Sequence, residues 1–299
     1  MITLTKNKLI AFRDTYGFRP LVIGKLNDAY IVCSETCALD TVGAKFIREI
    51  APGEIIAIDE KGIQVVGKVK STKKSFCLFE YVYLARPDSI FNKQLVHQVR
   101  QRSGEILAHE SPVGADMVVA VPDSGTSAAI GYSKASGIPY GEVLIKNRYI
   151  GRTFIQPEQH IREMGVKLKF NPLREIVKGK RIIIVDDSIV RGTTMKKIVK
   201  MLKNCGAKKI HIRVCSPPVT DPCYFGIDTP DKKQLIASHM SVKEIKKFID
   251  ADSLAYLSLE GLKKASRVKS NRLCTSCFDG KYPMSVKGGF RKDVFETIS

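Results

Sequence analysis

The chain has 299 residues, which is long enough for two domains and at least one sizeable hydrophobic core. Apolar residues make up 44% of it, which excludes global disorder. Its longest apolar runs are far shorter than the roughly 18 residues that a membrane span requires. The first residues also lack the apolar segment and cleavage site of a secretory signal, so we expect a cytoplasmic protein.

The formal net charge is +19, and most of the excess lies in two segments. Residues 146–181 carry ten basic and three acidic side chains, and residues 261–299 carry nine basic and three acidic ones. A basic loop attracts and stabilises a multiply charged anion, so the first segment indicates a polyphosphate ligand. For the second segment a solvated lysine-rich surface is the simpler interpretation, because no recognisable nucleic-acid-binding motif accompanies the charge.

Residues 1–70 have the pattern of short strands separated by turns. One helix is expected over residues 37–50, and the expected strands cover residues 21–24, 29–33, 54–59 and 63–66. Turn-forming pairs such as Pro52-Gly53 and Lys61-Gly62 lie between them. The pattern predicts a β-rich segment that is too small to form a core of its own.

From residue 116 onward, expected strands alternate with expected helices. The strands cover residues 117–121, 142–145, 181–185 and 209–214, and the helices cover residues 127–136 and 194–204. This alternation is typical of an α/β domain whose parallel sheet is covered by helices on both faces. The stretch 146–172 is longer than the roughly 12 to 15 residues of an ordinary loop, and we interpret it as an active-site lid.

The most informative segment runs from Arg181 to Thr194. An apolar strand there ends in two adjacent acids, Asp186 and Asp187, and the chain continues through hydroxyl residues into a helix. Ligands of open α/β sheets bind at the carboxyl ends of the strands, and a helix N-terminus binds phosphate. The two acids suit ribose hydroxyls, directly or through Mg²⁺, and Gly192 lets the backbone approach a phosphate closely. The simpler alternative, a turn in which one Asp caps the helix, requires neither the second acid nor the sequence Gly-Thr-Thr.

Residues 185–194 resemble the ribose-5-phosphate loop of the type I phosphoribosyltransferases. Further segments resemble the family of glutamine phosphoribosylpyrophosphate amidotransferases, and they are residues 11–21, 79–89, 121–124, 146–157 and 216–228. The resemblance implies a type I phosphoribosyltransferase fold at residues 71–258. Residues 1–70 would then be the C-terminal remnant of a glutaminase domain with an N-terminal nucleophile, and residues 259–299 a C-terminal tail.

The resemblance also implies an activity, in which ammonia displaces pyrophosphate from C1 of phosphoribosylpyrophosphate (PRPP). The product is 5-phosphoribosylamine, and the reaction is the first step of purine biosynthesis. By this resemblance Asp186 and Asp187 bind ribose and Mg²⁺, Ser124 adds to the metal site, and Lys146 and Arg148 open a mobile loop over the pyrophosphate. The residues that would bind the 5-phosphate are Ser188, Val190, Arg191, Gly192, Thr193 and Thr194. Positioning and electrostatics would carry the catalysis, so we assign no general base.

Eight cysteines are present, and disulfides are not their expected use in a cytoplasmic chain. By itself the sequence Cys274-Thr-Ser-Cys277 leaves open a structural pair, a redox pair and half of a four-sulfur site for zinc or an iron–sulfur cluster. Some members of the resembled family carry a [4Fe–4S] cluster, and their ligand contexts match Cys77, Cys223 and the terminal pair. The resemblance thus implies a structural cluster, and we expect the other four cysteines to be core thiols.

The start of the chain departs from the resembled family. In that family an N-terminal cysteine hydrolyses glutamine, whereas this chain begins Met1-Ile2-Thr3 and its first cysteine is Cys33. A motif that belongs late in the glutaminase domain begins here at Arg13. We therefore expect no intrinsic glutaminase activity. The strand edges left exposed would be covered by a separate glutaminase chain, or the sequence is a truncated reading of a longer gene.

Two alternatives to the amidophosphoribosyltransferase activity stay open at this point. One is an inactive truncated product, and the other is a non-enzymatic regulator that senses PRPP, since some transcriptional repressors use the same fold. The expected partners are PRPP, ammonia or glutamine, and further copies of the chain. Neither a membrane nor a nucleic acid is an expected partner.

Overall fold

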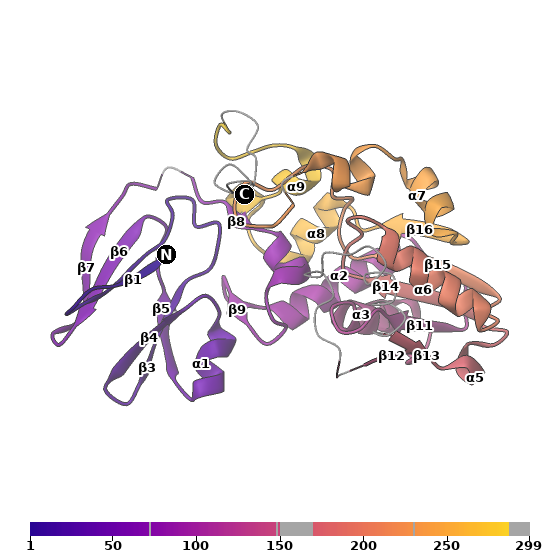
Figure 1. Ribbon diagram of the computed structural model, residues 1–299, viewed down its shortest axis with the longest axis horizontal. Coiled ribbons are helices and arrows are strands. Elements are labelled where there is room, and N and C mark those ends of the chain that lie inside the picture. The colour runs from indigo at the N-terminus through magenta and orange to yellow at the C-terminus, as the bar shows by residue number, and fades with distance from the viewer. Residues whose placement is uncertain (72, 148, 150–169, 230, 287–299) are drawn as a thin grey trace, which may run out of the picture. The chain divides into compact units, whose positions relative to one another are not determined.

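The computed structural model describes residues 1–71, 73–147, 149, 170–229 and 231–286 (Figure 1). Contacts divide these residues into two compact units, one of residues 1–99, 266–276 and 280–286, the other of residues 100–265 and 277–279. The division at residues 70 and 258 that we expect from the family resemblance stays a prediction. No helix in the described part of the chain is long and apolar enough to cross a membrane.

The described part of the first unit contains two larger antiparallel sheets, besides the antiparallel pair of short strands at residues 90–95. One has the strand order β1-β2-β6-β7, formed by β1 (Ile2–Leu4), β2 (Leu9–Phe12), β6 (Glu54–Asp59) and β7 (Gly62–Lys68). The other has the order β4-β3-β5, formed by β3 (Val22–Leu26), β4 (Ala29–Cys33) and β5 (Lys45–Glu49). The strands expected at residues 21–24, 29–33, 54–59 and 63–66 are thus confirmed.

Two expectations for the first unit are wrong. The helix expected over residues 37–50 ends early, since α1 spans only Thr36–Val42. Gly43 ends it in the left-handed conformation with φ 73°, and the chain then turns back to pair β5 with β3. The unit also has a core of its own, because strands of both sheets contribute buried apolar side chains to it. The buried residues of this core are Ala11, Leu21, Ile23, Ile50, Ile56 and Ile58.

Short elements complete the first unit. Two parallel strands, β8 (Phe76–Cys77) and β17 (Leu273–Cys274), join residues almost two hundred positions apart. The other short elements near them in the sequence are η1 (Glu80–Leu84), β9 (Ile90–Phe91), β10 (Gln94–Leu95), η5 (Ser270–Arg272) and α9 (Ser276–Asp279).

A parallel sheet forms the centre of the second unit. Its strand order is β11-β14-β15-β16, and the strands are β11 (Met117–Ala120), β14 (Arg181–Asp186), β15 (Lys209–Val214) and β16 (Ser253–Tyr256). The helices are α2 (Val96–Glu110), α3 (Thr126–Ser136), α5 (Arg174–Val177), α6 (Thr193–Asn204), α7 (Val242–Ile249) and α8 (Leu259–Ser266), several of them labelled in Figure 1. Short turns η3 (Lys232–Gln234) and η4 (Ile236–Ser238) precede α7. The expected alternation of parallel strands and helices is confirmed.

The central strand β14 is buried on both faces. Ile182 and Ile184 belong to a core cluster that includes buried side chains of α6 and α7. Ile183 and Val185 point to the opposite face, because side chains alternate along a strand, and they are fully buried as well. Helices therefore cover both sides of the sheet, as a continuous apolar run predicts.

Part of the predicted lid is ordered as strand. Residues 170–172 form β13 (Phe170–Pro172), which pairs antiparallel with β12 (Leu144–Lys146). Most of the predicted lid, residues 150–169, lies outside the described residues.

Candidate functional site

The two predicted acids stand at the carboxyl end of the central strand. Asp186 is the last residue of β14 and Asp187 follows it, and the two are only 8% and 7% exposed. The amide of Asp187 donates to Oδ1 of Asp186 at 2.9 Å, and the amide of Cys215 donates to the carbonyl of Asp186 at 2.9 Å. Because β14 has a parallel neighbour on each side, both carboxyl groups are held at the edge where α/β sheets bind ligands.

Hydroxyl groups approach both carboxylate oxygens of Asp187. Ser124 donates to Oδ1 and Ser188 donates to Oδ2, each at 2.6 Å. Ser124 lies in the turn between β11 and α3, which starts with a cis peptide bond between Pro122 and Asp123. The structure therefore brings together Ser124 and Asp187, which the sequence analysis placed in one metal site although they are 63 positions apart.

A glycine lets this turn lie close to β14. A Cβ atom at Gly125 would lie 2.5 Å from the carbonyl oxygen of Val185 and 3.0 Å from that of Val121. The amide of Gly125 donates to the carbonyl of Val121 at 3.0 Å. Any larger residue at position 125 would push the turn, and Ser124 with it, away from Asp187.

The predicted phosphate loop leads from β14 into α6. Gly192 has φ +74° and precedes Thr193, the first residue of α6, and no side chain caps this helix N-terminus. A Cβ atom at Gly192 would lie 2.9 Å from Cδ1 of Ile236 and 3.2 Å from Cε1 of Phe248. The carbonyl of Val190 accepts a hydrogen bond from the amide of Ile236 at 2.8 Å. The first-turn amides of α6 can therefore bind an anion, and the segment around Ile236 supports the loop.

Two basic side chains of the predicted site have acidic or polar partners. The Nζ atom of Lys146, at the end of β12, forms an ion pair with Oδ2 of Asp123. Arg191, in the phosphate loop, donates from Nη2 to Oε1 of Gln234. Arg148, the other predicted lid residue, lies outside the described residues.

Sequence reasoning did not identify Asp123, Gln234 or Ile236 as parts of the site. Asp123 lies in the same turn as Ser124, so the motif at residues 121–124 could have pointed to it. Gln234 and Ile236 lie more than 40 positions from the phosphate loop. No local pattern marks them, because their role depends on the path of the chain between β15 and α7.

One buried thiol lies behind the acids. Burial, and after it the negative charges of Asp187 and Asp186, raise the pKa of the Cys215 thiol well above its usual value. Cys215 is therefore a neutral group in the core, which agrees with the prediction of a core thiol.

The four cysteines predicted as cluster ligands fall into two pairs. Cys77 and Cys274 are register partners in the two-stranded sheet of the first unit, and both are 8% exposed. In the second unit, the carbonyl of Cys277 accepts hydrogen bonds from the amides of Thr220 and Asp221, at 2.9 and 3.2 Å, shortly before Cys223. In the described residues no group of three or more His, Cys, Asp or Glu is arranged to hold a metal ion. The cluster remains a prediction.

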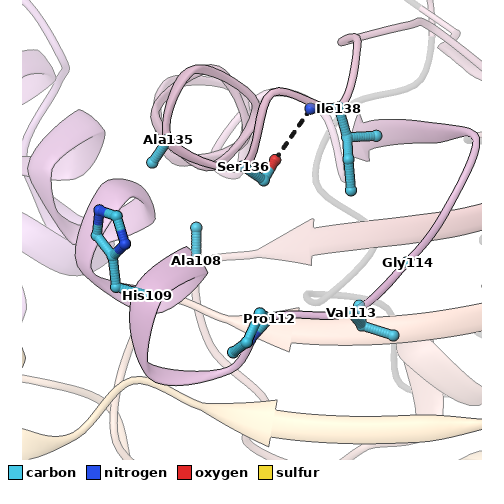
Figure 2. Close-up of a pocket in the computed structure, with 8 residues that line it drawn as sticks. All are labelled: Ala108, His109, Pro112, Val113, Gly114, Ala135, Ser136 and Ile138. Carbon is cyan, nitrogen blue, oxygen red and sulfur yellow. Dashed lines mark hydrogen bonds between the residues drawn. The ribbon is translucent and has the colours of Figure 1, made fainter.

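A hollow drawn in Figure 2 lies apart from the predicted site. It is lined by Ala108, His109, Pro112, Val113, Gly114, Ala135, Ser136 and Ile138. The helix α3 begins after the carboxyl end of β11 and ends at Ser136, which lines the hollow. The hollow therefore lies near the amino end of β11, away from the predicted site. Its lining is mostly apolar and contains none of the predicted site residues.

A protein-family model and curated relatives match this chain. The model of the phosphoribosyl transferase domain family matches residues 88–220. The amidophosphoribosyltransferase of Synechocystis sp. is 51% identical over 291 residues, covering 96% of this chain and 59% of the relative. The amidophosphoribosyltransferase of Archaeoglobus fulgidus is 51% identical over 290 residues, covering 96% of this chain and 64% of the relative.

Solved structures give the same result. Glutamine PRPP amidotransferase from B. subtilis, complexed with ADP and GMP, is 50% identical with a TM-score of 0.87, covering 94% of this chain and 63% of that one. A structure described as the allosteric regulatory enzyme of purine biosynthesis is 48% identical with a TM-score of 0.89, covering 97% of this chain and 63% of that one. The chain thus spans about 60% of the length of these relatives. Over that part it has the α/β fold of the type I phosphoribosyltransferases and is similar to the amidophosphoribosyltransferases.

Proposed function

We propose that this chain catalyses the amidophosphoribosyltransferase reaction with ammonia. Ammonia attacks C1 of PRPP, a C–N bond forms, and the C–O bond to pyrophosphate breaks. The nitrogen then loses a proton to water, leaving 5-phosphoribosylamine. The observation that carries the proposal is the meeting of Ser124, Asp187 and the α6 N-terminus at one edge of the parallel sheet, in a chain about 50% identical to enzymes of that name.

Each part of the site has a role in this reaction. Asp186 and Asp187 would accept hydrogen bonds from the ribose hydroxyls, and the amides after Gly192 would bind the 5-phosphate. Lys146 and the turn at Ser124 would face the leaving pyrophosphate. The ammonium group of Lys146 would stabilise the negative charge that grows on the pyrophosphate as it leaves. Together these groups fix the sugar at both ends, so that C1 is presented to ammonia in one orientation.

Mg²⁺ is the cation that these side chains fit. The carboxylates of Asp186 and Asp187 and the hydroxyl of Ser124 are oxygen donors, which Mg²⁺ prefers. Bound there, the ion would neutralise charge on the pyrophosphate. The hydrogen bonds of Ser124 and Ser188 to Asp187 orient both of its carboxylate oxygens.

Release of pyrophosphate tests the proposed function. The purified protein is mixed with PRPP, Mg²⁺ and an ammonium salt, and pyrophosphate is measured with a coupled enzyme. We expect release that depends on ammonium and is abolished in the double variant Asp186→Asn, Asp187→Asn. No release above background with ammonium would refute the activity and favour an inactive product or a PRPP-binding regulator.

We also propose a [4Fe–4S] cluster held by Cys77, Cys223, Cys274 and Cys277. Four thiolates are the common ligand set of such clusters, and the direct pairing of Cys77 with Cys274 supports the proposal. Protein purified without oxygen should contain iron and acid-labile sulfide and absorb visible light. Cys274→Ser should abolish both, whereas Cys205→Ser, at a buried cysteine outside the ligand set, should not. Absence of iron from the wild-type protein refutes the ligand assignment.

A further inference from the structure

Two neighbouring residues of one turn face different parts of the site. Ser124 donates to Asp187, whereas the carboxylate of Asp123 forms an ion pair with Nζ of Lys146. The amide of Thr126, the first residue of α3, donates to the carbonyl of Asp123 at 3.3 Å. Together with the close approach of Gly125 to β14, this bond holds the turn, so Asp123 is presented to Lys146 by the same backbone that places Ser124.

The ion pair is partly open to solvent. The side chain of Lys146 is 34% exposed and that of Asp123 is 76% exposed. Within the described residues neither side chain has a second ion-pair partner. Among the described residues Asp123 is thus the one carboxylate partner of Lys146, and a pyrophosphate group that approaches Lys146 must compete with it.

We propose that Asp123 is a positioning residue that sets the affinity for pyrophosphate-bearing ligands by competing for the ammonium group of Lys146. The inference rests on the proposed function, which places Lys146 at the leaving pyrophosphate. A pyrophosphate carries several negative charges and can draw the ammonium away from a single carboxylate. Ribose 5-phosphate has only the phosphate expected at the α6 loop, so its affinity does not depend on Asp123. The pair thus lowers the affinity for ligands that carry the pyrophosphate and leaves the affinity for the sugar phosphate alone unchanged.

The expected effect is small and measurable. Exposed ion pairs contribute little free energy, and their loss corresponds to about a 1.5- to 5-fold change in a dissociation constant. Replacing Asp123 by asparagine keeps the size of the side chain and removes its charge. The Asp123→Asn variant should therefore bind Mg²⁺-PRPP and Mg²⁺-pyrophosphate about 1.5- to 5-fold more tightly than the wild type, and the gain should shrink as salt is added.

Calorimetric titrations with PRPP, pyrophosphate and ribose 5-phosphate test the inference. They compare the wild type, Asp123→Asn, Lys146→Met and the double variant, with Asp123→Glu as the conservative replacement. We expect tighter binding of the two pyrophosphate-bearing ligands by Asp123→Asn, unchanged binding of ribose 5-phosphate, and wild-type affinity in Asp123→Glu. In the Lys146→Met background the Asp123→Asn change should have no effect.

Two results would overturn the inference. The first is unchanged or weaker pyrophosphate binding by Asp123→Asn. The second is tighter binding that persists without Lys146, which would mean that Asp123 simply repels the anion. Failure of the proposed function has a different signature, since the wild type would then release no pyrophosphate from PRPP with ammonium, whereas these titrations measure binding alone. In that case the titrations with pyrophosphate still show whether Asp123 competes with pyrophosphate for the ammonium group of Lys146.

Discussion

Replacing Gly192 by alanine should destabilise the protein and weaken its binding of phosphate. Gly192 has φ +74°, a conformation that costs a residue with a Cβ atom about 1–2 kcal/mol. The added Cβ would also lie 2.9 Å from Cδ1 of Ile236, which is 4% exposed and has little room to move. Such overpacking adds about 1–3 kcal/mol, so we expect a total loss of about 2–5 kcal/mol.

The protein contains a matched control for the conformational part of this loss. Gly137, which ends α3, has φ +71°, and a Cβ atom there would meet no atom within 4 Å. Gly137→Ala should therefore cost only the conformational strain of about 1–2 kcal/mol. The difference between the two variants measures the crowding at Gly192.

Urea unfolding and calorimetry with ribose 5-phosphate check both effects. If the loop moves, first-turn amides of α6 lose hydrogen bonds to the phosphate. Each bond to a charged group contributes about 1.5–3 kcal/mol, so we expect at least about tenfold weaker binding by Gly192→Ala. Gly137→Ala should bind as the wild type does. Equal destabilisation of the two variants would refute the crowding, and unchanged binding by Gly192→Ala would refute the phosphate loop.

Three further predictions concern the core, pH and thiol reactivity. Ile184→Ala, at a fully buried position of β14, should lower the free energy of unfolding by about 2–5 kcal/mol in urea titrations; a smaller loss would contradict its place in the core. Hydrogen bonds from Arg181 lower the pKa of Asp116 from 3.8 to about 2, so this carboxylate stabilises the fold above pH 3.8 and loses that effect as the pH falls toward 2. The unfolding midpoint of Asp116→Asn should therefore fall less than that of the wild type over this interval, and parallel curves would contradict the pairing. Cys215, buried and with a raised pKa, should resist alkylation at pH 8 until the protein is unfolded, as mass spectrometry of its peptide would show; rapid labelling of the native protein would contradict its burial.

Local patterns were sufficient for much of the second unit. The apolar run before Asp186 predicts a strand buried on both faces, and β14 has that character. The acids and Gly192 lie within seven residues of one another, so their common position at the end of this strand follows from chain connectivity alone. For the same reason the helix after Gly192 could be placed to within one residue.

Patterns were insufficient where the backbone conformation depends on a distant partner. Residues 45–49 were expected to continue a helix, yet they form β5 because β3 offers them hydrogen bonds. The core of the first unit was missed for a related reason, since its buried residues come from strands of two sheets that are separated along the chain. In both cases the decisive contact joins segments that are separated along the chain.

The amino-acid sequence alone was enough to indicate an α/β sheet with two acids and a phosphate loop at the end of one strand. These features are local, because apolar periodicity, adjacent acids and a glycine before a helix are all read within about 15 residues. The pairing of Ser124 with Asp187 and of Asp123 with Lys146 required the folded structure. Those contacts depend on how closely the turn before α3 approaches β14 and β12, and close packing between distant segments leaves no local mark in a sequence.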